Sequence, residues 1–173
     1  MDISHQILEL ELIKRYDRPV FEYDEILYLF DTGSDTPVWC SGEDMFTNTF
    51  KDAVKTNYDV YLSGFGEGVT PAKAYIIPKF VLKKDDVAFE IDNLHVAVTD
   101  YHSLNFDFIL SNTMFSKTDN MISNNRNTLQ IHMFSDRPYV CTPLMDGSEM
   151  KKISVWTNLN GDRHQRVLSP AST

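Results

Sequence analysis

Apolar residues in this chain come in short runs of strand length separated by polar turns, and this spacing constrains the fold more than any other feature. Residues 8–12, Leu-Glu-Leu-Glu-Leu, alternate with a period of two, as in a strand with one buried face. Residues 26–30 are continuously apolar, which is typical of a strand buried on both faces. Similar runs predict strands at 60–62, 74–82, 87–91, 94–98, 106–110, 129–133 and 153–156. The chain is therefore expected to be an all-β barrel or sandwich.

Two further signals modify this all-β pattern. Ser41 is placed to begin a short helix that would carry Phe46 and Phe50 on one face, and a second helical turn is predicted at 113–118. Pro78 lies inside a strand-like run, where it has no N–H to give to a neighbouring strand. We therefore expect an edge strand or a bulge at that position.

Length and composition exclude several classes of protein. The 173 residues, 42% of them hydrophobic, fit a single domain over 1–173. A net charge of −9 argues against nucleic acid or an anionic membrane as the main partner. Two cysteines, Cys40 and Cys141, are too few for a disulfide framework. No run reaches the roughly 20 apolar residues of a membrane span, and no leader sequence is visible, so a cytoplasmic location is expected.

The pattern that indicates chemistry is Asp31-Thr32-Gly33-Ser34, which follows the continuously apolar run directly. A lone carboxylate at the end of a buried strand needs partners, because burial otherwise forces it to become neutral. The hydroxyls of Thr32 and Ser34 and the N–H groups around Gly33 are suited to supply them. The alternative is a solvated Asp-Thr-Gly turn in an unrelated β-barrel binding protein.

From Ile26 to about Ile131 the chain resembles a retropepsin-like aspartic protease, the single-domain, retroviral-type branch of the pepsin fold. The tetrapeptide at 31–34 matches the Asp-Thr-Gly-Ser/Ala motif of that family. Residues 63–68, Ser-Gly-Phe-Gly-Glu-Gly, resemble its glycine-rich flap hairpin. Residues 106–115 are similar to the apolar-apolar-Gly segment that leads into its short helix. The family usually has glycine where Ser111 stands, so a requirement for positive φ there would strain the serine.

The resemblance implies a closed pepsin- or retropepsin-type barrel with one or two short helices, assembled as a homodimer. It places the retropepsin-like core at about 20–133, preceded by an N-terminal strand within 5–14. The C-terminal extension, 134–173, has no role that the resemblance indicates, and its length leaves the mode of dimer closure open.

The resemblance also implies an aspartic endopeptidase that hydrolyses an extended peptide or protein substrate. Two carboxylates about 3 Å apart share one proton, so one of them activates water while the other protonates the carbonyl oxygen. Because the chain contains one Asp-Thr-Gly, the second catalytic carboxylate is expected to be Asp31 of another copy. Water is the nucleophile, so no metal and no organic cofactor is expected.

The residues around the acid receive supporting roles by the same resemblance. Thr32 is expected to join the two active-site loops through bonds from its hydroxyl to the backbone. Gly33 would allow close approach of the substrate, and Ser34 would hydrogen-bond the outer oxygen of Asp31.

Ser63, Gly64, Phe65 and Gly66 are the expected substrate-binding flap. The hairpin would close over an extended peptide, pair with its main chain and exclude water. Phe65 at its tip would supply an apolar contact. The alternatives are a flexible hairpin turn and a phosphate loop, and the second is disfavoured because the Gly-x-Gly-x-x-Gly spacing is missing.

Other assignments remain open at this level. A catalytically inactive member would keep the same fold as a peptide-binding or assembly module. Cys40 is expected to be a buried structural thiol rather than a nucleophile. Asp107 lacks a following Thr-Gly and is not expected to pair with the catalytic acid. His95 and His102, with Asp100 between them, lack the spacing of a zinc site.

Overall fold

The computed structural model describes residues 5–63, 69–100, 105–116, 118–123, 127–135, 137–140, 152–154 and 167–168. Strands dominate this part of the chain, so the expected all-β fold is confirmed in its coarser form, a mostly-β chain with short helical segments. No helix within it is long and apolar enough to cross a membrane. The strands are β1 (Gln6–Glu11), β2 (Val20–Tyr23), β3 (Ile26–Asp31), β4 (Val38–Trp39), β5 (Val54–Ser63), β6 (Val69–Lys84), β7 (Val87–Val98), β8 (Phe108–Ser111), β9 (Asp119–Ser123), β10 (Thr128–Met133), β11 (Tyr139–Val140), β12 (Lys152–Ser154) and β13 (Val167–Leu168). The helical segments are α1 (Glu43–Thr49) and the 3-10 turn η1 (Asn112–Phe115).

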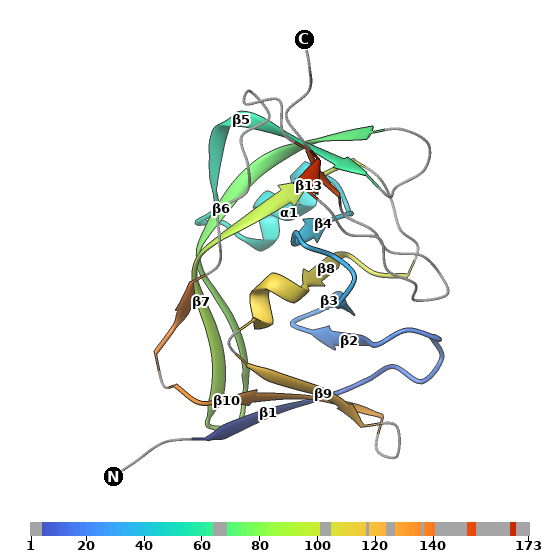
Figure 1. The fold of residues 1–173 in the computed structure, drawn as a ribbon, viewed down its shortest axis with the longest axis vertical. Helices are drawn as coiled ribbons and strands as arrows, with labels where there is room; N and C mark the ends of the chain where they lie inside the picture. Colours follow the sequence, from blue (N-terminus) through green and yellow to red (C-terminus); the bar gives the residue numbers. More distant parts are fainter. Residues whose placement is uncertain are drawn as a thin grey trace.

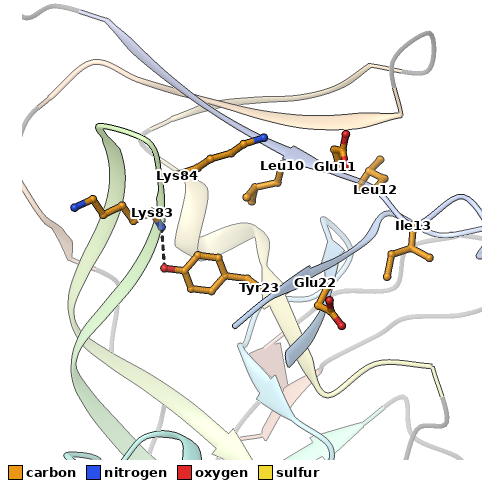
Figure 2. A pocket seen from close by; sticks show the side chains of 8 residues that line it. All are labelled: Leu10, Glu11, Leu12, Ile13, Glu22, Tyr23, Lys83 and Lys84. Carbon is orange, nitrogen blue, oxygen red and sulfur yellow. Dashed lines mark hydrogen bonds between the residues drawn. The ribbon is translucent and has the colours of Figure 1, made fainter. Parts of the chain in front are cut away.

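The strands form two sheets (Figure 1). One has the order β1-β10-β9, and the other has the order β13-β12-β5-β6-β7-β4-β8-β3-β2, with β11 added beside β7. Both orders are open within the described residues, so the predicted closed barrel is not found there. The physical reason is that β1, β10 and β9 pair only with one another and pack against the larger sheet without continuing its hydrogen-bond ladder. Where the end of β1 meets β2 and the end of β6, residues of these strands line an open pocket (Figure 2).

β3 is buried on both faces, as its continuously apolar sequence predicts. Successive side chains of a strand point to opposite faces. Tyr28 and Phe30 accordingly join the larger core cluster, whereas Leu29 joins the smaller cluster on the other side of the sheet. This double burial fixes the register of the strand, and Asp31 is its last residue.

Phe108 on β8, which lies opposite Tyr28 in the middle of β3, is the centre of an aromatic cluster. Its fully buried ring lies 5.5 Å from the ring of Tyr28, 5.8 Å from that of Trp39, 5.9 Å from that of Phe50 and 5.8 Å from that of Phe80, measured between centroids. The four neighbours come from β3, β4, the end of α1 and β6. One side chain therefore connects the strand of Asp31 to the elements around it.

The predicted helix is present as α1, but its N-terminal cap differs from the prediction. Gly42 occupies the cap position with φ 90°, and no side chain caps the helix. This positive φ favours glycine, which lacks the Cβ that makes the conformation strained. The hydroxyl of Ser41 instead donates to Oδ1 of Asp107 at 2.6 Å. Phe46 is fully buried, as the predicted helix face requires.

The predicted edge is found for part of the strand only: β6 lies between β5 and β7 as far as Ile76, and the segment around Pro78 beyond it lacks β5 as a neighbour. The last pair between β5 and β6 joins Val54 to Ile76, so Pro78 lies beyond the end of β5. Its missing N–H therefore removes no bond to that strand. Opposite it, Asn93 has φ 53°, a value that asparagine tolerates better than most residues. The two runs predicted at 87–91 and 94–98 consequently form one strand, β7, with a local irregularity.

The described parts of 134–173 add strands to the large sheet. β11 pairs in parallel with β7, and β12 pairs in parallel with β5 through Ile153 opposite Leu62. β13 pairs antiparallel with β12. The C-terminal extension therefore contributes to the sheet, next to the strand that leads into residues 64–68.

Candidate active site

Asp31 lies where β3 leaves the core. β3 runs parallel to β8, and the register places Asp31 opposite Ser111. The side chain of Asp31 is half-buried. Its Oδ1 accepts the N–H of Gly33 at 2.8 Å, and its Oδ2 is shielded from solvent. The backbone of the following turn therefore orients the carboxylate.

Ser34 does not make the bond predicted for it. Its hydroxyl has one proton and donates it to the carbonyl oxygen of Thr36 at 2.8 Å, rather than to Asp31. The N–H of Ser34 donates to the carbonyl oxygen of Asp31 at 3.1 Å. Ser34 is fully buried, so its role is to hold the turn closed from within.

Two residues that directly follow β8 hold the turn in place, and the sequence analysis did not assign them this role. The N–H of Asn112 donates to the carbonyl oxygen of Ser34 at 2.9 Å, and its Nδ2 donates to the carbonyl oxygen of Thr32 at 3.1 Å and to Oδ1 of Asp35 at 3.2 Å. The hydroxyl of Thr113 donates to the carbonyl oxygen of Asp35 at 3.0 Å. The signal available in the sequence was that Asn112 and Thr113 are polar and directly follow the apolar run that forms β8.

Ser111, where the resembled family usually has glycine, shows no backbone strain. Its φ of −92° and ψ of 164° are extended values that any residue adopts. Its side chain is buried, and its hydroxyl hydrogen-bonds that of Thr113 over 2.7 Å. The serine therefore fits the turn from β8 into η1.

The structure brings Asp31, Thr32, Gly33 and Ser34 together in one turn. Thr32 is exposed, whereas Gly33 and Ser34 are buried. Ser63 is the last residue of β5, and in the sheet order β6, β7, β4 and β8 lie between that strand and β3.

The central flap residues, Gly64, Phe65 and Gly66, lie outside the described residues. The strands on either side of them pair antiparallel, with Ser63 opposite Val69. This pairing is the arrangement that a hairpin requires.

Asp107, which directly precedes β8, has a structural role. Its Oδ2 accepts the N–H of Leu27 at 3.0 Å, and its Oδ1 accepts the hydroxyl of Ser41. The register places it level with Leu27, four positions before Asp31, or about 13 Å along the strand. Asp107 is therefore too far away to form a carboxylate pair with Asp31.

Replacing Asp107 with alanine is expected to lower the free energy of unfolding by about 2–3 kcal/mol, because the N–H of Leu27 loses its carboxylate acceptor. The comparison variant Ser41→Ala removes one of the two bonds and is expected to cost about 1 kcal/mol. Urea denaturation measures both values. Equal, small effects in the two variants would contradict the structural role of the carboxylate.

Cys40 is a free, fully buried thiol, as expected. Its N–H donates to the carbonyl oxygen of Asp107 at 2.8 Å. Burial raises the pKa of the thiol to about 12, and the negative charge of Asp107 adds to the shift. The thiol therefore stays protonated at neutral pH and is not an activated nucleophile.

Within the described ranges, no group of three or more His, Cys, Asp and Glu side chains is placed to hold a metal ion. His95 is half-buried on β7, and burial lowers its pKa. His102 lies outside the described residues.

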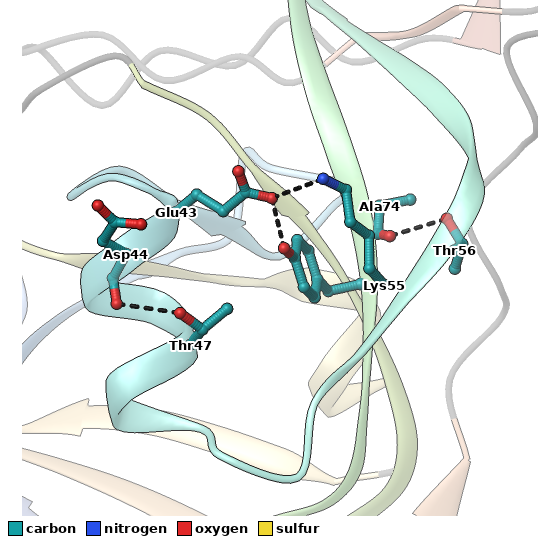
Figure 3. Close-up of polar contacts among 7 residues, drawn as sticks. Glu43, Asp44, Thr47, Lys55, Thr56 and Ala74 are labelled. Carbon is teal, nitrogen blue, oxygen red and sulfur yellow. Dashed lines mark hydrogen bonds and ion pairs between the residues drawn. The ribbon is translucent and has the colours of Figure 1, made fainter.

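A polar cluster fastens α1 to the strands that flank residues 64–68 (Figure 3). Glu43, in the first turn of α1, accepts the hydroxyl of Tyr75 on β6 and forms an ion pair with Lys55 on β5 at 3.0 Å. The hydrogen bond from Tyr75, followed by that from Lys55, lowers the pKa of Glu43. Between the same strands, the hydroxyl of Thr56 donates to the carbonyl oxygen of Ala74 at 2.8 Å. The cluster holds β5 and β6 against the helix at the end of the strand pair that is farther from residues 64–68.

The chain matches no protein-family model and no curated protein. Its function is therefore argued from the site itself.

Proposed function

We propose that this protein is an aspartic endopeptidase of the retropepsin type, in which Asp31 from each of two copies forms the catalytic pair. One observation carries the proposal. A half-buried carboxylate stands at the end of a strand buried on both faces, and the N–H of Gly33 orients it at 2.8 Å. A turn aspartate commonly accepts the N–H two positions on, so the features that favour a catalytic acid are the doubly buried strand and the shielding of Oδ2 from solvent.

The attachment of the turn to β8 and η1 favours a catalytic role. Catalytic groups must be held within a fraction of an ångström of their working geometry by their surroundings. Asn112 and Thr113 bind the turn at Thr32, Ser34 and Asp35. These bonds restrict movement of the backbone that positions the carboxylate.

The proposed reaction uses one proton shared by two carboxylates. The ionised carboxylate takes a proton from water as the water oxygen bonds to the peptide carbonyl carbon, and the protonated carboxyl gives its proton to the carbonyl oxygen. In the tetrahedral intermediate the C–N bond then breaks as the leaving nitrogen receives the proton that the first carboxylate took from water. The second carboxylate regains a proton from a hydroxyl of the intermediate, which becomes the product carboxyl, so the pair again holds one proton. Water is the nucleophile, so the reaction needs neither a metal nor an organic cofactor.

The second carboxylate is proposed to come from another copy of the chain. Asp107 is excluded as a partner by its distance from Asp31, and no second Asp-Thr-Gly occurs in the sequence. A homodimer with a two-fold axis would bring the two Asp31 side chains together. The homodimer of the resembled family is part of this proposal.

The shared pair is tested by mixing wild type with Asp31→Asn in equal amounts and allowing the subunits to exchange. If mixed dimers are inactive, activity falls to about half that of the same amount of unmixed wild type, because half of the wild-type subunits enter mixed dimers. Sedimentation of both proteins establishes the solution mass. Undiminished activity after complete exchange would contradict the shared pair.

The proposed substrate is an extended peptide with apolar side chains around the cleaved bond. It would pair with main-chain groups of the hairpin at Ser63, Gly64, Phe65 and Gly66, the proposed flap. This preference comes from the resemblance, and sequencing the products of a digested peptide mixture tests it.

A peptide-binding or assembly module without catalysis is the second candidate, and one observation favours it. The outer edge of β5 accepts β12 in parallel, with Ile153 opposite Leu62. This edge therefore pairs with an extended segment of the chain itself. Saturable peptide binding without turnover, equal in wild type and Asp31→Asn, would identify this second function.

A further inference from the structure

Two histidine side chains meet on the outer face of the three-stranded sheet. His5 directly precedes β1, and His132 lies on β10, the strand that pairs with β1 (Figure 1). Nε2 of His5 is 2.9 Å from Nδ1 of His132. The two residues are 127 positions apart in the sequence, so the pairing of the strands is what brings their rings together. Asp31 belongs to the other sheet, so an inference from this pair does not depend on the proposed protease activity.

Neighbouring side chains determine which nitrogen of His132 carries its proton. Nε2 of Gln130 donates to Oε2 of Glu9 at 2.7 Å, and the amide oxygen of Gln130 lies 3.3 Å from Nε2 of His132. An amide oxygen only accepts hydrogen bonds, so Nε2–H of His132 is the donor to it. Nδ1 of the neutral ring therefore has a lone pair, which accepts Nε2–H of His5.

This series of hydrogen bonds resembles the support found behind histidines that bind metal ions. Such a histidine usually donates its other ring N–H to an oxygen acceptor, which fixes the ring and makes the ligand nitrogen more basic. Here the acceptor is the amide of Gln130, which is itself held by the carboxylate of Glu9. The ring of His5 is stacked on that of Phe134, with centroids 4.8 Å apart and planes 11° apart. Both rings are therefore positioned before any ligand binds.

The spacing of the two ring nitrogens fits one class of metal geometry. Ring nitrogens bind such ions at about 2.0–2.1 Å, so two of them lie about 2.9 Å apart at the right angle of a square-planar site and about 3.3 Å apart at a tetrahedral angle. The observed separation of 2.9 Å matches the square-planar value. Square-planar and tetragonal sites are typical of Cu²⁺ and Ni²⁺, whereas Zn²⁺ favours a tetrahedral site.

The charge of the surrounding strands favours a cation. β1, β9 and β10 contain Glu9, Glu11 and Asp119 but no lysine or arginine. Asp119 on β9 lies opposite His132, and residues directly opposite each other in an antiparallel pair point to the same face. A positive ion at the histidine pair therefore meets no like charge from these three strands.

We propose that His5 and His132 together bind Cu²⁺ through Nε2 and Nδ1, with water completing the coordination. The ring proton of His5 moves from Nε2 to Nδ1 by exchange with water, so both rings stay neutral and both lone pairs bind the ion. His5 is exposed, which allows its ring to turn until the lone pairs converge. Two protein ligands agree with finding no group of three or more within the described ranges. The bound ion fastens the start of β1, at the edge of its sheet, to β10.

The probe is Cu²⁺ alone, titrated by calorimetry into the full-length wild-type chain in a weakly coordinating buffer. The expected dissociation constant is on the order of 1–100 μM, as for a site with two protein ligands and water in the other positions. Ni²⁺ and Zn²⁺ are expected to bind at least about tenfold more weakly, because Cu²⁺ forms the tightest complexes with nitrogen ligands. Mg²⁺, which prefers oxygen ligands, is not expected to compete.

Variants assign the roles of the side chains. His5→Gln and His132→Gln are each expected to weaken Cu²⁺ binding more than about tenfold, because either leaves a single ring nitrogen. Gln130→Met removes the acceptor behind His132 and is expected to weaken binding about tenfold. His95→Gln, the same change on β7 in the other sheet, is the control and should leave binding unchanged. Thermal unfolding without metal checks the fold of all four variants.

Electron paramagnetic resonance of bound Cu²⁺ separates the ligands from the residue that supports them. Wild type and Gln130→Met are expected to show two coordinating ring nitrogens, and His132→Gln only one. Saturating Cu²⁺ is also expected to raise the unfolding temperature of wild type but not of His5→Gln, because the ion bridges two strands that are paired only in the folded state.

Equal affinity of wild type, His5→Gln and His132→Gln for Cu²⁺ would overturn the proposal, because the ion would then bind elsewhere. Tighter binding of Zn²⁺ than of Cu²⁺ would also overturn it, since this order contradicts the square-planar geometry. Absence of saturable Cu²⁺ binding up to about 1 mM would have the same consequence.

Discussion

Replacing Asp31 with asparagine is expected to lower peptide cleavage at least about a thousandfold and to leave the fold intact. General acid–base groups contribute factors of about 10²–10⁴ each, and this substitution removes the same group from both subunits of the proposed dimer. The amide oxygen of asparagine still accepts the N–H of Gly33, so the turn keeps its bond. Loss of activity therefore reports chemistry rather than unfolding.

The measurement is digestion of a complex peptide mixture at pH 4 to 7 and at several protein concentrations. Asp52→Asn is the matched control, because it makes the same chemical change at an exposed turn after α1 and should retain activity. Thermal unfolding of all three proteins checks the fold. Equal cleavage by wild type and Asp31→Asn would remove the protease proposal and leave the binding module.

Replacing Phe108 with alanine is expected to lower the free energy of unfolding by about 3–5 kcal/mol, a large part of the 5–15 kcal/mol typical of a domain. The side chain is fully buried, with four aromatic rings around it. Its removal leaves a cavity that these rings cannot close without moving β3, β4, β6 and the end of α1. Because β8 supports the turn of Asp31, activity should fall at temperatures where the variant remains mostly folded.

Urea denaturation of three variants tests this expectation. Phe108→Leu keeps most of the volume and is expected to cost about 1–2 kcal/mol. Phe134→Ala removes the same atoms at a site that is 51% exposed and should cost less than about 1 kcal/mol. A similar loss at positions 108 and 134 would show that the aromatic cluster is not the core of the fold.

The strands with the clearest local patterns were predictable from the sequence. Leu8 and Leu10 alternate with polar residues, and the run at 26–30 is continuously apolar, so burial alone indicates where β1 and β3 lie. β4 contains only Val38 and Trp39, too few residues to show a period. Its position depends on partners in β7 and β8 that are distant in the sequence.

In the site, too, only the contacts between residues close together in the sequence were predictable. Asp31 and Gly33 are neighbours in the chain, and their hydrogen bond follows from the short Asp-Thr-Gly turn. The bond from Ser34 to Thr36 competes with the predicted bond to Asp31, and sequence alone does not decide between two nearby acceptors. Asn112 was missed because its contact with the turn exists only after β3 and β8 have paired.

The bond between Asn112 and Thr32 joins residues 80 positions apart, which has a consequence for the order of events during synthesis. The N-terminal part of a chain leaves the ribosome first. Asp31 and its turn therefore emerge long before Asn112 and Thr113, which hold the turn in place. Contacts of this sequence separation form late and slowly compared with local ones. For the proposed catalysis this means that the growing chain cannot cut proteins until residues 112 and 113 have also emerged and β8 has paired with β3.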